Sequence, residues 1–186
     1  MCLSLVYDNM YRHSYLLGEI GDNMAAGPEI CIEGEFRIDS KGTWFHEGAP
    51  IGRREMVKLF ARVLVRDGEG AYWLETPVEK VPVMVEDAPF LAVELKVQGR
   101  AAAQALRFRT NIDRWVELGA DHPLIVRAGP RPYVKLAGGM EALVVRPVYY
   151  QLADLAVAGP AGTEHPGVWS GGRFFPLTPA APEAPR

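Results

Sequence analysis

The sequence predicts an α+β protein with two structurally similar repeats, each a small curved, mostly antiparallel sheet with one amphipathic helix. Three observations support this prediction. Residues 36–64 have the pattern of a β-hairpin that leads directly into a helix. Short stretches in which apolar and polar residues alternate then follow, separated by turns rich in glycine and proline. A weaker copy of the hairpin and helix returns near the C-terminus, which indicates one unit used twice.

The first hairpin and helix carry the clearest signals. Residues 36–38 alternate apolar and polar side chains, as a half-buried strand does, and residues 44–46 are expected to run back antiparallel. Between them, Asp39, Ser40 and Gly42 favour a turn. Apolar residues then recur at helical spacing on one face: Met56, Leu59, Phe60, Val63 and Leu64. Asp67 and Gly68 are predicted to end this helix, because glycine takes the left-handed cap readily.

Three strands complete the first half. Residues 70–74 form a short aromatic strand, and residues 81–85 form a second, whose Pro82 favours an edge position or the start of a strand. The clearest alternation in the protein spans residues 91–98. Residues 99–103 are predicted to join the two halves.

The second half repeats the design less clearly. Strands are expected at residues 106–109, 115–118 and 124–127, before a hairpin that starts at Tyr133 and a helix over residues 149–157. A shift of 97 residues places Tyr133 on Phe36 and Pro147 on Pro50. Residues 172–179 then resemble residues 70–77. If the duplication is real, residues 36–64 and 133–157 should superpose.

The domain organisation follows from these patterns. Residues 1–30 are predicted to be a disordered extension, residues 31–98 the N-terminal repeat, residues 99–179 the C-terminal repeat and residues 180–186 a disordered tail. The first 23 residues share neither period nor turn signals with the remainder, and Met24 has the context of an alternative start. The sequence leaves open whether translation begins at Met1 or at Met24.

Composition limits the classes of function. Of 186 residues, 48% are hydrophobic and 23% charged, as in a soluble globular protein. A formal net charge of −3 and the lack of a basic stripe argue against a nucleic-acid partner. No apolar run is long enough for a membrane span, and the N-terminus lacks the features of a signal peptide. Cys2 and Cys31 are far apart and have no metal-binding spacing, which favours a reducing cytoplasm.

Several unlinked motifs together resemble a known bacterial family. They are FRID followed by GTWFHEGAPI, then YWLETPVE, VEDAPF, FRTNID and RPVYYQLADL, in this order between Phe36 and Leu155. The chain resembles an uncharacterised family that is catalogued only as a domain of unknown function. The resemblance implies a two-repeat α+β fold and a role in ligand binding or signal transduction, and it brings no catalytic residue.

Motifs for reactive chemistry are missing from the sequence. The four histidines are far apart and form none of the close pairs of compact metal sites: His13, His46, His122 and His165. Dinucleotide-binding, P-loop and nucleophile-elbow motifs are also missing. We therefore expect no metal site, no cofactor and no catalytic residue.

Six polar residues in turns are the candidates for a ligand site. They are Glu79, Glu86 and Asp87 in the first half, and Asn111, Asp113 and His122 in the second. Each has an ordinary explanation as a turn former or a solvated charge. If a ligand binds, the expected place is an aromatic-lined crevice between the repeats, with these residues as its polar contacts.

Two functions remain open. We favour a non-catalytic ligand-binding or signalling module, because no reactive constellation is present. The alternative is a small soluble enzyme that uses carboxylates in the region from Glu79 to Asp87 together with His122. The sequence does not identify the small molecule or the protein partner, nor the oligomeric state.

Overall fold

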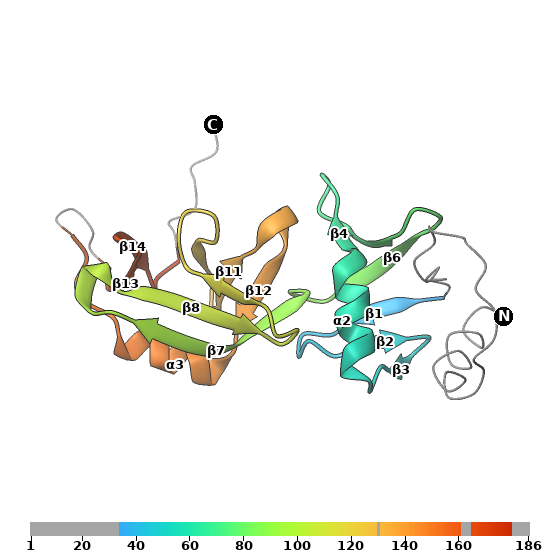
Figure 1. Cartoon of the computed structure of the whole chain (residues 1–186), viewed down its shortest axis with the longest axis horizontal. Helices are drawn as coiled ribbons and strands as arrows, with labels where there is room; N and C mark the ends of the chain where they lie inside the picture. The colour runs from blue at the N-terminus through green and yellow to red at the C-terminus, as the bar shows by residue number, and fades with distance from the viewer. Residues whose placement is uncertain (1–33, 130, 161–164, 180–186) are drawn as a thin grey trace, which may run out of the picture.

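The protein forms two six-stranded sheets that lie side by side along the long axis of the molecule (Figure 1). The structure, a computed structural model, describes residues 34–129, 131–160 and 165–179. The predicted extension at residues 1–30, the predicted tail at residues 180–186, both cysteines and His13 lie outside the described residues.

The first sheet has the strand order β3-β2-β1-β6-β5-β4. Its strands are β1 (Phe36–Ile38), β2 (Trp44–His46), β3 (Ala49–Pro50), β4 (Leu64–Arg66), β5 (Tyr72–Glu75) and β6 (Lys80–Val85). All neighbours are antiparallel except the central pair, β1 and β6, which are parallel. The chain therefore begins and ends the first unit at the centre of its sheet.

The second sheet has the order β10-β11-β12-β7-β8-β9. Its strands are β7 (Phe90–Gln98), β8 (Ala105–Thr110), β9 (Trp115–Glu117), β10 (Leu124–Arg127), β11 (Arg131–Lys135) and β12 (Glu141–Val144). Here too the first and last strands, β7 and β12, form a parallel central pair. Read from β9 to β10, this order matches that of the first sheet strand for strand, so the two-repeat α+β fold is confirmed.

The matching strands differ from those predicted. The first hairpin, β1 and β2, corresponds to β7 and β8, whereas the hairpin at Tyr133 corresponds to β5 and β6. The predicted superposition of residues 36–64 on 133–157 is therefore wrong. A hairpin followed by a helix occurs twice, but at different places in the order of strands: α2 (Arg54–Val63) joins β3 to β4, whereas α3 (Arg146–Asp154) follows β12.

The boundary between the units lies before β7 and not after it. β7 pairs with β12 on one side and with β8 on the other, so it is a central strand of the second sheet. The predicted division into 31–98 and 99–179 is corrected on this point. Alternation identifies a strand, but it does not say which sheet the strand joins. A β-bulge between Ala92 and Glu94 also changes the face that β7 buries, since Phe90 and Ala92 are buried before it.

Helix α2 ends earlier than predicted. It stops at Val63, and Leu64 is already extended, because β4 pairs there with β5. Asp67 instead forms the β4–β5 turn, where its Oδ1 accepts hydrogen bonds from the backbone N–H groups of Glu69 and Ala71. Competition from the sheet, which the local sequence does not show, therefore decides where the helix ends.

Strand β6 is central, so of the two positions that Pro82 favoured, an edge or the start of a strand, the edge is wrong. It lies between β1 and β5, and its parallel pairing with β1 begins only at Val83. Pro82, which has no N–H to donate, therefore precedes the paired residues on that side. The hydrophobic core of this unit packs between the sheet and α2, where the Phe60 ring lies 5.2 Å from the Phe36 ring.

The second unit has its own helix and an added hairpin. Val148 and Leu152 bury one face of α3, with Leu152 fully buried. The hairpin consists of β13 (Gly167–Ser170) and β14 (Arg173–Pro176). Ser170 Oγ, which is buried, donates a hydrogen bond to the Leu118 carbonyl at 2.7 Å and accepts one from the Leu106 N–H at 3.0 Å. This hydroxyl fastens the hairpin to the second sheet.

Candidate functional site

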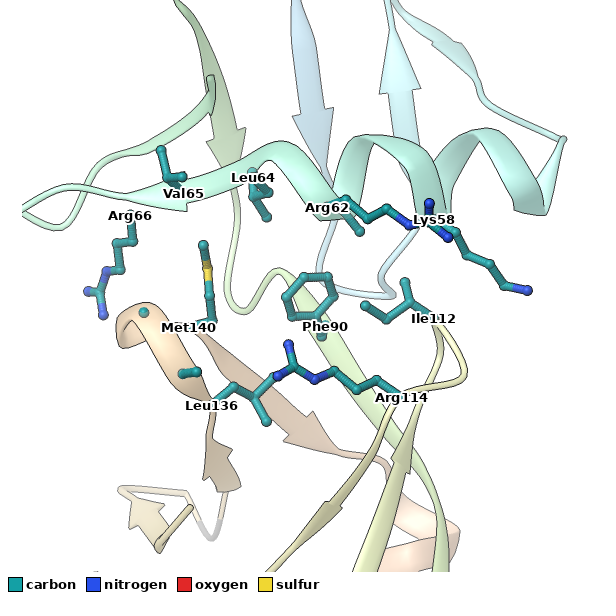
Figure 2. A pocket seen from close by; sticks show the side chains of 13 residues that line it. Lys58, Arg62, Leu64, Val65, Arg66, Phe90, Ile112, Arg114, Leu136 and Met140 are labelled. Atoms are coloured by element: carbon teal, nitrogen blue, oxygen red, sulfur yellow. The ribbon is translucent and has the colours of Figure 1, made fainter. Parts of the chain in front are cut away.

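A groove of about 640 Å³ lies between the two units (Figure 2). The first unit contributes the end of α2 and strand β4, and the second contributes β7, the β8–β9 turn and the 3₁₀ turn η2 (Ala137–Gly139). The lining residues are Lys58, Ala61, Arg62, Leu64, Val65, Arg66, Phe90, Ile112, Arg114, Leu136, Ala137, Gly138 and Met140. Its volume is in the range of small-molecule pockets.

The groove has an apolar floor. Leu64, Phe90, Leu136 and Met140 are all buried, each less than about a tenth exposed. Leu64 comes from the first unit and the other three from the second, so the floor exists only because the two units meet. An apolar molecule bound there would remove further apolar surface from water, at about 25 cal/mol per Å².

Every charged residue that lines the groove is basic. Two of them are held by the protein itself. Lys58 Nζ lies 2.7 Å from Glu55 and 3.0 Å from Asp113. Arg66 Nη1 donates a hydrogen bond to the Gly139 carbonyl at 3.0 Å, across the junction. Within the described part of the chain, no carboxylate forms an ion pair with Arg62 or Arg114.

Local structure places these cations along one groove. Lys58 and Arg62 are four residues apart on α2 and so lie on the same helix face, one turn apart. Arg114 follows the tight β8–β9 turn, in which Asp113 has a φ of +63°. In Figure 2, Lys58 and Arg62 extend from the helix of the first unit, whereas Arg114 belongs to the second unit and extends in the opposite direction, under Phe90 toward Leu136.

Asp113 links the two units electrostatically. Its carboxylate accepts hydrogen bonds from Arg54 Nη2 at 2.7 Å and Arg109 Nη1 at 2.7 Å, and Lys58 Nζ lies at 3.0 Å. Arg54 and Lys58 belong to α2, whereas Arg109 belongs to β8. The hydrogen bond from Lys58 lowers the pKa of the Asp113 carboxyl below its usual value. The contact between Lys58 and Asp113 therefore connects the lining of the groove to the carboxylate that joins the two units.

This lowered pKa predicts a pH effect. Because the folded-state pKa of Asp113 is depressed, its contribution to stability is complete above the unfolded value of about 3.9 and is lost as pH falls through the folded pKa. Asp113→Asn keeps the turn, since Asn tolerates positive φ. We expect the Tm gap between wild type and Asp113→Asn at pH 7 to close in acid, measured by thermal unfolding across the acid range. A constant gap would contradict this role.

A second polar cluster lies where β6 passes into β7. Asp87 accepts a hydrogen bond from the Tyr133 hydroxyl at 2.7 Å and forms an ion pair with Arg131. The Arg127 guanidinium lies 4.3 Å from the centre of the Tyr133 ring and also binds the buried Glu141. Burial, followed by the hydrogen bond to Asp87, raises the pKa of Tyr133, so its hydroxyl stays protonated and acts as a donor. The cluster holds the linker in place.

The six residues predicted as ligand contacts do not line the groove. Three of them lie at the junction of the units: Asp87, Asp113 and Asn111, whose Oδ1 accepts a hydrogen bond from the Leu91 N–H at 3.1 Å. The others lie elsewhere. Glu86 pairs with Arg37 at 2.6 Å, the Glu79 N–H donates to Thr76 Oγ1, and His122 Nδ1 lies 3.0 Å from the Lys135 carbonyl oxygen. Their role in binding stays a prediction.

The residues that do line the groove were missed by sequence reasoning. Arg62 lies outside the apolar face predicted for the helix, and nothing in the sequence distinguishes Arg114. The signal was indirect, because Ile112 and Arg114 flank the predicted Asp113 and alternate with it along the β8–β9 turn. Phe90 is the aromatic member of the lining, where several aromatic side chains were expected.

Two other kinds of feature are missing from the residues that the structure describes. No group of three or more His, Cys, Asp or Glu side chains there is placed to hold a metal ion. No helix in the same residues is both long enough and apolar enough to cross a membrane.

Comparison with known proteins identifies the family. Residues 25–88 match the N-terminal domain of the unknown-function family DUF1285, and residues 89–177 match its C-terminal domain. A crystal structure of a DUF1285 family protein from Silicibacter pomeroyi DSS-3 shares 40% sequence identity over 79% of this chain and 81% of that one, with a TM-score of 0.73. The chain belongs to the DUF1285 family.

A second DUF1285 crystal structure, from Shewanella baltica OS155, is more distant. It shares 28% identity over 65% of this chain and 91% of that one, with a TM-score of 0.54. None of the curated proteins compared with the chain matches it. The division of DUF1285 at residue 88 coincides with the boundary between the two sheets, so each family domain is one six-stranded unit.

Proposed function

We propose that this DUF1285 protein is a non-catalytic, small-molecule-binding module whose ligand lies in the groove between the units. The observation that carries the proposal is an apolar-floored, cation-lined groove to which both units contribute. Small-molecule sites commonly lie at such domain junctions and combine an apolar wall with a few polar groups. We place its action in the bacterial cytoplasm, because two cysteines that are far apart and have no metal-binding spacing fit a reducing compartment.

A signalling role follows from the position of Lys58. It lines the groove and at the same time binds Asp113, which joins α2 to the second unit. A ligand that attracts Lys58 weakens its ion pair with Asp113. Binding in the groove is thereby coupled to the contacts that join the two units. The carboxylates of the enzymatic alternative have different partners, Arg37 for Glu86 and Tyr133 for Asp87, which favours binding over catalysis.

A groove-filling variant tests the proposal. The purified protein is screened by thermal shift against soluble metabolites of positive, negative and zero charge, and the fate of each hit is followed by mass spectrometry. Ala61 lines the groove, so Ala61→Trp is expected to abolish the shift caused by a true groove ligand. The matched control is Ala153→Trp on the exposed face of α3.

The outcomes separate the two functions. Ligands that are recovered unchanged, and that bind wild type and Ala153→Trp but not Ala61→Trp, support a binding module. Hits that bind all three proteins equally would place the site elsewhere and refute the proposal. Conversion of a hit into a product would favour the enzymatic alternative.

A further inference from the structure

We propose that the groove ligand is a soluble amphipathic anion, whose acidic head binds the arginines that line the groove, Arg62 and Arg114, and whose apolar body lies over the floor. This inference rests on the proposed function and adds the chemical class of the ligand. It follows from three features: Arg62 and Arg114 have no carboxylate partners among the described residues, they line one groove although they belong to different units, and the surface of that groove is partly apolar.

Arg62 and Arg114 differ from most other arginines at the junction because they form no ion pair with a described carboxylate. Arg54, Arg109, Arg127 and Arg131 each form an ion pair with a carboxylate. Arg62 and Arg114 are exposed and form none with the residues that the structure describes. An unpaired surface arginine is ordinary by itself. Two that line one concave groove, from opposite units, make a positive region that an anion can neutralise.

Guanidinium groups favour a particular kind of anion. Each presents a planar fork of donors that matches a carboxylate or a phosphate in a bidentate arrangement. Lys58 adds positive charge, but its ammonium group is already bound to Glu55 and Asp113. These contacts, and the hydrogen bond to Glu55 most of all, raise the pKa of Lys58. Arg66 also has no carboxylate partner in the described residues, but it donates to the backbone carbonyls of Gly70 and Gly139. Arg62 and Arg114 are therefore the groove cations whose side chains no described residue holds.

The floor argues that the anion carries an apolar body. Above the buried floor, Ala61, Val65 and Ile112 line the groove and are only partly buried, and an inorganic ion would leave their apolar surface in water. The volume of about 640 Å³ also exceeds what a single inorganic ion fills. A short alkyl or aryl chain with one carboxylate or phosphate fits both the charge and the floor.

Fluorescence titration with 8-anilinonaphthalene-1-sulfonate, an aromatic anion, provides the test. We expect it to bind wild type and to be displaced by octanoate and octyl phosphate, but not by octanol, octyltrimethylammonium or inorganic phosphate. Arg62→Gln with Arg114→Gln is expected to weaken binding of the probe and of octanoate by about ten- to a hundredfold. Higher salt should weaken binding in wild type.

A control of equal charge change keeps the result interpretable. Arg146→Gln with Arg173→Gln removes two exposed arginines of the second unit that do not line the groove, and it should leave both affinities unchanged. Circular dichroism verifies that both double variants are folded.

Four results would overturn the inference. Octanol that competes as well as octanoate, with no effect of Arg62→Gln and Arg114→Gln, would leave a groove ligand that is not an anion. Equal competition by inorganic phosphate would leave an anion site without an apolar part. Sedimentation with phosphatidylglycerol vesicles that is lost in the double variant would assign the site to a membrane lipid. Unchanged probe binding in Ala61→Trp would refute the inference and the proposed function together.

Discussion

Replacing Gly167 by alanine is expected to lower the free energy of unfolding by about 3 kcal/mol. A Cβ atom at this position would lie against the carbonyl oxygen of Phe175 and 2.6 Å from Cζ of the Phe174 ring. The oxygen belongs to the backbone of the partner strand β14, so a side-chain rotation cannot relieve the clash. The β13–β14 hairpin has to separate locally, which weakens its attachment to the second sheet.

Thermal unfolding measures this effect, with Tm expected to fall by about 6–12 °C. Gly119→Ala is the matched control, because no atom lies within 4 Å of its added Cβ and its φ is not in the left-handed region. Its stability should change little or rise, since alanine reduces the conformational entropy of the unfolded chain. A loss in Gly167→Ala no larger than that in the control would show that the hairpin adjusts without strain.

The second large effect is expected at the ion pair between Arg127 and Glu141. Glu141 is buried, with 5% of its side chain exposed, and its two carboxylate oxygens lie 2.6 and 2.9 Å from Arg127 Nη2. Arg127→Met leaves this carboxylate buried without its partner. We expect a loss of about 2–3 kcal/mol, below the 3–5 kcal/mol typical of fully buried pairs, because 46% of the Arg127 side chain is exposed.

A double variant separates the charge from the contact. Arg127→Met with Glu141→Leu removes both members, and most of the lost stability should return, since no unpaired charge remains. Lys80→Met serves as the control, because Lys80 and Glu75 are both about half exposed and such pairs contribute about 0–1 kcal/mol. Urea unfolding of the four proteins gives the comparison. A double variant as unstable as Arg127→Met alone would point to lost packing instead of an uncompensated charge.

Local patterns in the sequence predicted the individual elements well. Residues 36–38 and 44–46 form the hairpin where alternation and turn signals place it, and the helical spacing from Met56 marks α2. These features depend on interactions between residues close in the chain. The fold class was predictable for the same reason, because two copies of short strands and one helix leave few ways to bury their apolar faces.

Pairing over long distances was not predictable from the same patterns. β7 has strong alternation, but its assignment to the second sheet depends on β12, which follows about fifty residues later in the chain. Pro82 suggested an edge, yet β6 lies at the centre because the pairing with β1 starts one residue later. The correspondence of the repeats failed for this reason too, since similar hairpins occupy different positions in the two sheets.

The sequence predicted where the candidate site lies, but not which residues line it. A crevice between the repeats follows from a two-unit fold, and the structure has a groove there. Its lining was not predictable, because Arg62 and Arg114 have ordinary surroundings in the sequence and come to line one groove only when the units meet. Asp113 has strong turn signals, and these marked the correct turn, but its carboxylate points to the cations of α2 and not into the groove.

The parallel pair at the centre of each sheet has a consequence for synthesis on the ribosome. β1 is made first but acquires its parallel neighbour only when β6 has emerged, after residue 85, and β7 waits in the same way for β12 at residue 144. Until then, the nascent chain carries a half-sheet with an unpaired inner edge. Each six-stranded sheet is therefore completed in one late step, when β6 or β12 arrives. Pauses in translation just before these strands would prolong the interval in which the unpaired edge can meet another chain.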